Sequence, residues 1–331
     1  MPRPDRSNAI DHVVVIMFEN RSFDNLLGRL YEPGEVASFA GVTGLGLSNP
    51  VPEWAADAVP GTAPKLVPYG TAAGMNVPSP DSGEEYQHVN TQLFGLIDPP
   101  SNRGMVAEHM VAPYNAPADP GQRPTMDGFV TDYISVFMAE MGRSPVFEEY
   151  AQIMMGYAPL QVPVTSALAR GFATFDHWFC EVPSQTFPNR SFFHAGTSSG
   201  FVVNMEPAEA FLLHNDAVTI FERLEAHGLT WRVYCDPPSH ISLTGIIHAP
   251  RLHERWETNF FTRSAAQRRR PGRTPTTRCS WSPSTSTAGP TTTFRRRPCC
   301  PRTRRLRSGR WASGSTVRAC GCRHRRLAVD R

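Results

Sequence analysis

The stretch "DHVVVIMFENRSFDN", residues 11–25, joins an apolar run directly to a string of polar residues. The run His12–Met17 is short, rich in β-branched residues and bounded by polar ones, which is typical of a central parallel strand buried on both faces. Glu19, Asn20 and Ser22 follow it, and open α/β sheets place ligands at this end of their strands. The stretch therefore predicts one half of a ligand site, although Asn20 and Ser22 could instead cap a helix.

Outward from this strand, the periodicity predicts an α/β fold with a doubly wound, mostly parallel sheet. Residues 32–125 are rich in Pro, Gly and Ser, which predicts a long, mostly irregular loop or lid region with a few short helices. The elements expected after it are helices within residues 126–155, 162–170 (capped by Gly171) and 217–227, and strands at residues 172–180 and 230–234.

The expected strand at 172–180 leads into "PSQTFPNR", residues 183–190, as a second polar strand end. A carboxylate and an amide such as Glu19 and Asn20 suit a hard divalent cation, and such a cation can activate the hydroxyl of Thr186 toward phosphorus. Arg21 or Arg190 could neutralise phosphate charge. Thr186 could equally be an ordinary turn residue, and Arg190 could hold a carboxylate within the fold.

Composition permits one large domain and excludes several other classes of protein. The chain has 331 residues, 40% of them apolar, which is enough for a sizeable core. We expect no transmembrane segment and no signal peptide, and hence a cytoplasmic protein by default, because no long apolar window is present. Only Cys180 and Cys235 of the seven cysteines precede residue 263, so a disulfide framework is not indicated.

The charge is divided unevenly along the chain. Residues 263–331 contain 19 Arg and one acid, Asp330, whereas the preceding part contains 14 basic and 29 acidic residues. The segment is dominated by Arg, Pro, Ser and Thr and shows neither helical nor strand periodicity, so we expect a disordered basic tail. Residues 1–262 are then expected to be the folded part of the chain.

Four strings, "DHVVVIMFENRSFDNLLG", "MDGF", "FDHWFCEVPSQTFPNRSFFHAGTSSG" and "WRVYCDPP", resemble the bacterial phosphoesterase family of phospholipases C and acid phosphatases. They occur in the family's order across residues 11–262. The family is alkaline-phosphatase-like, which implies a phosphate-ester substrate, favouring a phospholipase C-type phosphodiester over a phosphomonoester. No specific nucleic-acid partner is expected.

The resemblance also implies roles for individual residues. Glu19, Asn20 and Thr186 resemble ligands of a divalent metal ion of unspecified identity, and Thr186 resembles the nucleophile. Asn189 and Arg190 resemble the element that supports the nucleophile turn and binds substrate. His88 matches a histidine that contacts the phosphate or the leaving group, with a surface histidine as the alternative. His177 and His248 are expected in packing or loop roles.

The family's C-terminal acidic element, which completes its metal site, has no counterpart after Thr262. We expect a cation held by Glu19, Asn20 and Thr186 alone to bind weakly. A reading-frame shift near residues 263–268 would explain the tail, and predicts a C-terminally incomplete and inactive enzyme. Two other interpretations of the tail are nucleic-acid binding through its arginines and a zinc site at its cysteines, whose spacing fits no standard pattern.

Overall fold

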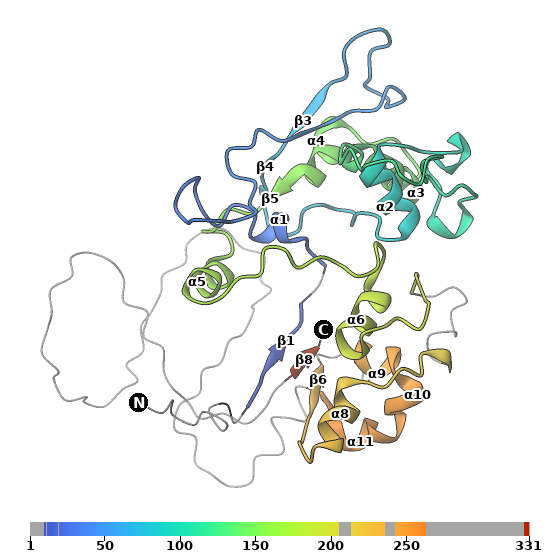
Figure 1. Cartoon of the computed structure of the whole chain (residues 1–331). Coiled ribbons are helices and arrows are strands. Elements are labelled where there is room, and N and C mark those ends of the chain that lie inside the picture. Colours follow the sequence, from blue (N-terminus) through green and yellow to red (C-terminus); the bar gives the residue numbers. More distant parts are fainter. Residues whose placement is uncertain are drawn as a thin grey trace, which may run out of the picture.

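The computed structural model describes residues 10, 12–18, 20–204, 213–235 and 242–262, together with the backbone of residues 328–330. Figure 1 shows two lobes joined by the segment that carries α5 (Pro163–Gly171). We call residues 20–160 the upper lobe. The lower lobe consists of residues 186–262 with the strands β1 (Val15–Ile16) and β8 (Ala328–Asp330).

The lower lobe contains a four-stranded parallel sheet in the order β1, β8, β6 and β7. Strands β6 (Val233–Cys235) and β7 (Phe260–Thr262) pair from Val233 opposite Phe260 to Cys235 opposite Thr262. Parallel pairing requires crossover connections, and helices supply them between β6 and β7, as expected for an α/β protein. The predicted strand at 230–234 is thus confirmed within a few residues.

The helices of the lower lobe lie between β1 and β7 in the sequence. They are α6 (Thr186–Ala195), α8 (Ile220–Ala226), α9 (Leu243–Ile247), α10 (Ala249–Leu252), η4 (His253–Arg255) and α11 (Trp256–Asn259). Thr219 and Glu222 form a capping box that begins α8, and Gly228 takes a left-handed conformation after it. The lobe's core is a cluster of apolar side chains: Phe221, Trp231, Val233, Leu252 and Phe260.

The upper lobe is built on α3 (Phe129–Met141), which ends at Gly142 with a left-handed φ of 66°. The short elements around it are α1 (Phe23–Leu26), β2 (Ser48–Pro50), β3 (Leu66–Pro68), β4 (Gly70–Thr71), α2 (Tyr86–Phe94), η1 (Pro100–Asn102), η2 (Ala107–His109), α4 (Phe147–Tyr150), η3 (Ala151–Met154) and β5 (Met155–Gly156). Strands β2 and β3 are antiparallel, and β4 and β5 are parallel.

Residues 32–125 are mostly irregular, as predicted, but they are also part of the core. Val51, Ala55 and Val67 pack with Tyr133 and Phe137 of α3 in one apolar cluster. Contacts of this kind depend on residues far apart in sequence, so the weak local periodicity did not indicate them. The region is therefore a structural part of the upper lobe as well as a run of loops.

Two predicted strands differ from the structure. Val13, Val14 and Ile16 are exposed, although burial on both faces was predicted, because β1 is an outer strand of the described sheet. Residues 172–180 form no strand, and Phe172 and Phe175 are exposed. An aromatic run becomes a strand only where a neighbouring strand can pair with it, and the structure describes no such partner.

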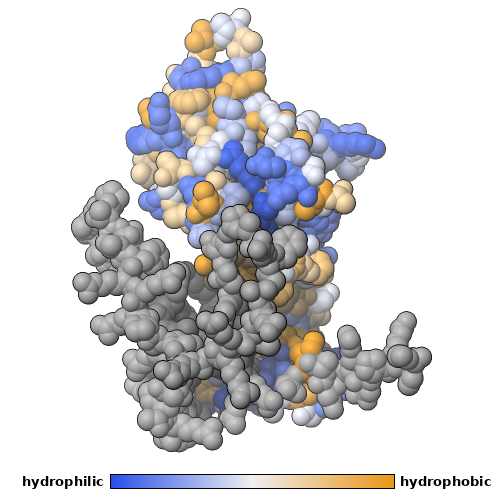
Figure 2. Space-filling view, turned by 90° about the vertical axis from the view of Figure 1, so that its left-hand side faces the viewer, coloured by the Kyte–Doolittle hydropathy of each residue, from blue (hydrophilic) through white to orange (hydrophobic). Residues whose placement is uncertain are grey.

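The aromatic side chains of this segment instead lie on the surface. Trp178 contacts Phe175 at a ring-centroid distance of 6.2 Å and Phe193 of α6 at 6.4 Å. The preceding helix α5 was predicted correctly, but Phe172 rather than Gly171 ends it, in an extended conformation. Figure 2 shows other apolar residues exposed in separate patches on a side face of the molecule.

The tail prediction is tested at three residues only. Ala328–Asp330 form β8 between β1 and β6, so this part of the tail is a strand rather than irregular chain. Residues 263–327 lie outside the described residues, and the division of the chain at residue 262 stays a prediction. No helix in the described part of the chain has the length and apolar character needed to cross a bilayer.

Candidate active site at the start of α6

Thr186 is the first residue of α6, which follows an irregular loop rather than the predicted strand. Pro188 falls in the first turn of the helix, where the lack of an N–H is tolerated. The hydroxyl of Thr186 is half-buried and makes no hydrogen bond with a described residue. A helix N-terminus with a nearby hydroxyl of this kind favours an anionic ligand such as a phosphate group.

The residues flanking Thr186 are held by a chain of hydrogen bonds. The Nε2 of Gln185 donates to Glu85 Oε1 at 2.8 Å, and its Oε1 accepts from the backbone N–H of Asn204 at 2.9 Å. Asn204 in turn accepts from the backbone N–H of Phe187 at 2.7 Å. The start of α6 is thereby connected to the upper lobe and to the loop that follows the helix.

Asn189 organises the loop that leads to Thr186. Its Oδ1 accepts from the backbone N–H groups of Glu181 and Val182, and its Nδ2 donates to the carbonyls of Val182, Ser184 and Gln185, all within 2.9 to 3.1 Å. Both ends of the amide are thus used within the loop. Asn189 therefore holds together the loop before Thr186, while the role of that loop in catalysis and direct binding of substrate by Asn189 stay predictions.

Substitution of Asn189 by alanine is expected to lower the free energy of unfolding by about 1 to 3 kcal/mol, since several backbone groups lose their partner. Urea unfolding monitored by tryptophan fluorescence measures this change. Asn90 is the matched control, because its Nδ2 makes a single exposed hydrogen bond to the carbonyl of Tyr114. An Asn189→Ala change no larger than that of Asn90→Ala would contradict the role of Asn189.

Arg190 follows Asn189 on α6 and is buried, with 5% of its surface exposed. A guanidinium at such depth has to be paired. Its predicted contact with substrate phosphate therefore stays a prediction, as does the alternative in which it holds a carboxylate of the fold.

The polar residues after β1 reach the upper lobe. Asn20 is exposed and donates a side-chain hydrogen bond to Glu84, while Arg21 donates to the carbonyl of Val77. Ser22 caps α1 by accepting from the backbone N–H of Asn25 at 3.1 Å. The capping alternative is therefore correct for Ser22, whereas Asn20 contacts a carboxylate. Glu19, the other predicted ligand, lies outside the described residues.

His88 is buried rather than a surface histidine, and it forms an ion pair. Its Nδ1 lies 2.8 Å from Oδ1 of Asp132, a fully buried carboxylate on α3 that also accepts from Gln92 Nε2 at 2.8 Å. Burial, the largest influence, lowers the pKa of His88, but the hydrogen bond and charge of Asp132, with Glu85 and Glu108, raise it above its usual value. Asp132 was not singled out from the sequence, although an acid within the apolar run of α3 is a detectable signal.

Two carboxylates that the sequence did not assign lie at this corner. Glu84 contacts Asn20, and Glu85 contacts Gln185, the residue before Thr186. Acidic side chains from within residues 1–262 therefore contact both polar segments of the predicted site. Even so, the described residues contain no group of three His, Cys, Asp or Glu side chains that could hold a metal ion. The predicted ligand Glu19 lies outside the described residues, and Asn20 and Thr186 are not of these residue types, so the predicted metal site stays a prediction.

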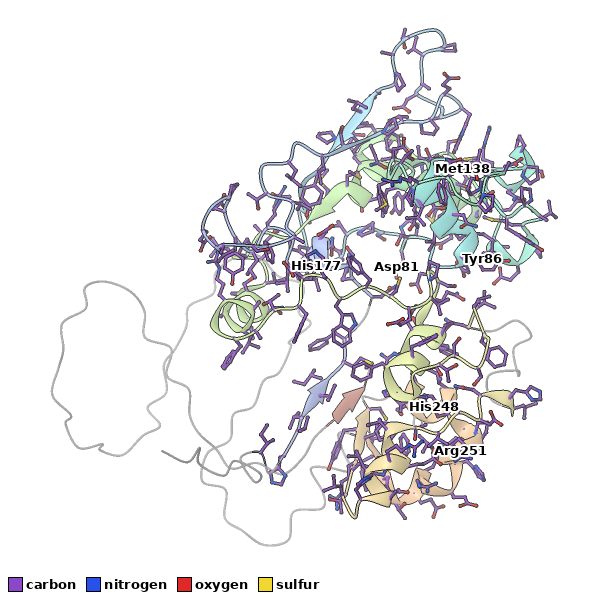
Figure 3. All side chains as sticks on the ribbon, in the orientation of Figure 1. Asp81, Tyr86, Met138, His177, His248 and Arg251 are labelled. Carbon is purple, nitrogen blue, oxygen red and sulfur yellow. The ribbon has the colours of Figure 1, made fainter. Side chains whose placement is uncertain are left out.

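His177 and His248 have the loop and packing roles that were predicted for them. His177 is exposed, and its Nδ1 lies 3.0 Å from Asp176. His248 is fully buried in the lower lobe, as labelled in Figure 3, where its Nδ1 lies 3.4 Å from Asn215 Nδ2. Its Nε2 is buried without a hydrogen-bond partner. Burial, with a smaller contribution from His194, lowers the pKa of His248 from 6.5 to about 3.

The buried neutral His248 predicts a loss of stability in acid. The unfolded chain binds a proton below pH 6.5, whereas the folded chain does so only near pH 3, so stability falls as pH falls through this window. Between about pH 6 and pH 4 we expect His248 to account for a loss of about 2 to 3 kcal/mol. Urea unfolding as a function of pH should show a shallower slope for His248→Gln, whereas the exposed His227→Gln should keep the original slope.

The fold and the site geometry together describe an α/β protein with a threonine at the N-terminus of a helix, a position that favours anions. Comparison with known proteins agrees with this class: the model of the Phosphoesterase family matches residues 10–277, and the chain belongs to that family of hydrolases that act on ester bonds. The sequence resemblance to this family is confirmed.

Three curated relatives come from Arabidopsis thaliana, a plant, although the sequence resemblance pointed to bacterial members. Non-specific phospholipase C6 is 30% identical over 229 residues, 69% of this chain and 35% of its own length. Non-specific phospholipase C3 is 29% identical, covering 69% and 37%, and non-specific phospholipase C4 is 30% identical, covering 70% and 37%. The chain thus spans about a third of the length of these relatives.

Proposed function

We propose that the chain carries the nucleophile-bearing part of a phosphoesterase, with Thr186 as the nucleophile. The observation that supports this best is the position of Thr186, whose hydroxyl has no hydrogen bond to a described residue and lies at the N-terminus of a ten-residue helix. Backbone N–H groups and the helix dipole there favour the phosphate charge that increases during attack.

The reaction follows from this placement in two steps. The oxygen of Thr186 forms a bond to phosphorus and releases its proton to solvent water, while the bond between phosphorus and the leaving oxygen breaks. The leaving oxygen takes up a proton, for which the imidazolium of His88 is the proposed source. Water then attacks the phosphothreonine: its oxygen bonds to phosphorus, the bond from phosphorus to the Thr186 oxygen breaks, and that oxygen takes up a proton to restore the hydroxyl. His88 regains its proton from solvent.

A divalent cation is proposed as cofactor on the family resemblance, with Glu19, Asn20 and Thr186 as the residues that would hold it. When bound, such an ion lowers the pKa of a coordinated hydroxyl and withdraws charge from phosphorus. The sequence predicts an inactive enzyme, because the family's C-terminal acidic element has no counterpart after Thr262. We propose instead a reduced rate, since Thr186 is in place at the start of α6. The frame shift near residues 263–268 is proposed as the origin of this defect.

The proposed substrate is a phosphodiester of the phospholipase C type. Three relatives are named non-specific phospholipases C, and this supports a phosphodiester over the phosphomonoester alternative. Nitrophenyl-phosphorylcholine and nitrophenyl phosphate distinguish the two, because faster release of nitrophenol from the first indicates diesterase activity.

Trapping of the covalent intermediate tests the proposed nucleophile directly. The full chain is incubated with nitrophenyl-phosphorylcholine, quenched in acid and digested for mass spectrometry. A phosphocholine or phosphate adduct on Thr186 is expected. Thr62, an exposed loop threonine in the same digest, should carry no adduct. An adduct on another residue, or turnover with no adduct on Thr186, would refute the assignment.

A further inference from the structure

A pocket of about 370 Å³ in the upper lobe is lined by residues that the candidate active site does not use. It lies where α1, β4 and β5 meet, three elements that Figure 1 shows side by side. Its wall comes from the segments that adjoin these elements and from the loop after α1, and it includes Arg29, Glu32, Thr43, Leu47, Tyr69 and Pro159. The pocket is therefore a candidate for a second ligand site.

Arg29 places a positive charge in the wall of this pocket. Its guanidinium carbon lies 4.8 Å from the ring centroid of Tyr69, and its Nη1 donates to the hydroxyl of Thr71. These contacts hold the guanidinium without neutralising it, because Arg29 forms no ion pair with a carboxylate of the described residues. Its Nε and Nη2 also make no hydrogen bond with a described residue. The side chain thus offers an oriented charge and free donors to an anionic ligand.

The hydroxyl of Thr43 is an independent indication of a ligand. Its Oγ1 is buried and makes no hydrogen bond with a described residue. A buried hydroxyl normally has a partner, because the loss of its contacts with water costs free energy. Thr43 lines the same pocket as Arg29, so a polar group on a bound molecule would supply the partner that the fold does not.

The other charged residue of the wall limits the ligand to a single negative charge. Glu32 is exposed and forms no ion pair with Arg29. A phosphomonoester carries nearly two charges at neutral pH, and the second would face Glu32 with no cation to balance it. A carboxylate carries one charge, and its two oxygens match the paired N–H groups of a guanidinium.

Apolar side chains form the remaining part of the wall: Val42, Leu47, Ala158 and Pro159. Val42 is buried by the protein itself, whereas 41% of the surface of Leu47 is exposed. An aliphatic body attached to the carboxylate would cover this apolar surface and remove it from water, which favours binding.

Backbone hydrogen bonds hold two sides of the pocket in place. The N–H of Val42 donates to the carbonyl of Gly28 at 2.7 Å, which fixes the loop against the end of α1. The N–H of Tyr69 donates to the carbonyl of Leu47 at 2.8 Å, which fixes the same loop against the start of β4. A ligand would therefore enter a pocket that needs little ordering, so a smaller part of its binding free energy is lost.

We propose that this pocket binds a monocarboxylate with an aliphatic body, with the carboxylate group paired to Arg29. Thr43 supplies a further hydrogen bond, and the aliphatic chain lies against Leu47 and Pro159. The site is independent of the proposed phosphoesterase reaction and shares none of its residues.

Titration of the full chain with octanoate tests the pocket without any need for turnover. Calorimetry should show saturable binding of octanoate, and octanamide, which has the same body but no charge, should bind at least about tenfold more weakly. Octyl phosphate at pH 8 should also bind more weakly than octanoate, because its second charge faces Glu32.

Variants of the wall show whether octanoate occupies this pocket. Arg29→Gln should weaken octanoate binding at least about tenfold while octanamide keeps its affinity, which reports that the pocket is intact. Arg123→Gln, at an exposed loop position of the upper lobe, is the matched control. Thr43→Val keeps the shape of the side chain and should weaken octanoate binding severalfold, and it provides the test if Arg29→Gln does not fold.

Each result either supports the assignment or overturns it. Equal octanoate affinity of Arg29→Gln and Arg123→Gln, or equal binding of octanoate and octanamide, would overturn it. Tighter binding of octyl phosphate would refute a monocarboxylate as the ligand. Thr186→Ala should keep the original octanoate affinity, and a loss of binding there would place the ligand at the candidate active site instead. Formation of the adduct on Thr186 is a separate result, so the pocket and the nucleophile can fail independently.

Discussion

Replacement of Thr186 by alanine is expected to lower kcat/KM for nitrophenyl-phosphorylcholine by about a thousandfold or more, because the variant lacks the attacking oxygen. The threonine hydroxyl forms the bond to phosphorus, so the loss appears in kcat, whereas KM changes little. Initial rates of nitrophenol release over a range of substrate concentrations measure both parameters. The Thr186→Ser variant keeps the oxygen and should retain measurable turnover with a phosphoserine intermediate.

Two controls separate this chemical role from an effect on folding. Thr186 makes no hydrogen bond with a described residue, so Thr186→Ala should change the free energy of unfolding by less than about 1 kcal/mol. Thr62→Ala, at an exposed loop position, should leave kcat/KM unchanged. Turnover by Thr186→Ala at more than about a tenth of the original rate would exclude Thr186 as the nucleophile.

Local sequence signals were sufficient for several elements of the fold. The helices predicted within residues 126–155 and 217–227 correspond to α3 and α8. Both have local end signals, Gly142 after α3 and the Thr219–Glu222 capping box at the start of α8, because capping residues fix the ends of a helix within a few positions. Such signals act through neighbouring residues in the chain. They can therefore be detected without knowledge of the tertiary structure.

Elements that depend on distant partners were not predictable in this way. The exposure of Val13 and Val14 and the absence of a strand at 172–180 follow from which strands adjoin each segment in space. The part of residues 32–125 that packs on α3 likewise depends on contacts across the upper lobe. Amino-acid preference describes how well a residue suits a strand, not whether a neighbouring strand is present.

The candidate site shows the same division. Thr186, Asn189 and His88 were found as members of polar strings that core packing does not require. Asp132, the partner of His88, and Glu85, the partner of Gln185, were not found, since hydrogen bonds between residues 44 and 100 positions apart leave no local pattern of their own. The side chains that carry chemistry are thus more visible in a sequence than those that hold them in position.

Loss of Asp132 is the largest change in stability that we expect. Asp132→Ala should lower the free energy of unfolding by about 3 to 5 kcal/mol, since the substitution breaks a buried pair with His88 and removes an acceptor of Gln92. Ser135→Ala on the same helix is the matched control. Its hydroxyl accepts one hydrogen bond, from the backbone N–H of Gly104, so about 1 kcal/mol is expected there.

The sign of the pH dependence distinguishes the charge of Asp132 from its packing. With Asp132 present, the raised pKa of His88 contributes stability that is complete below pH 6.5 and is lost as pH rises through the folded pKa. Without Asp132, burial remains the dominant influence on His88, and its contribution should be lost as pH falls, as at His248. Unfolding measured across pH should therefore show a reversed contribution of His88 in Asp132→Ala and the original contribution in Ser135→Ala. An unchanged slope in Asp132→Ala would mean that Asp132 acts only by filling space.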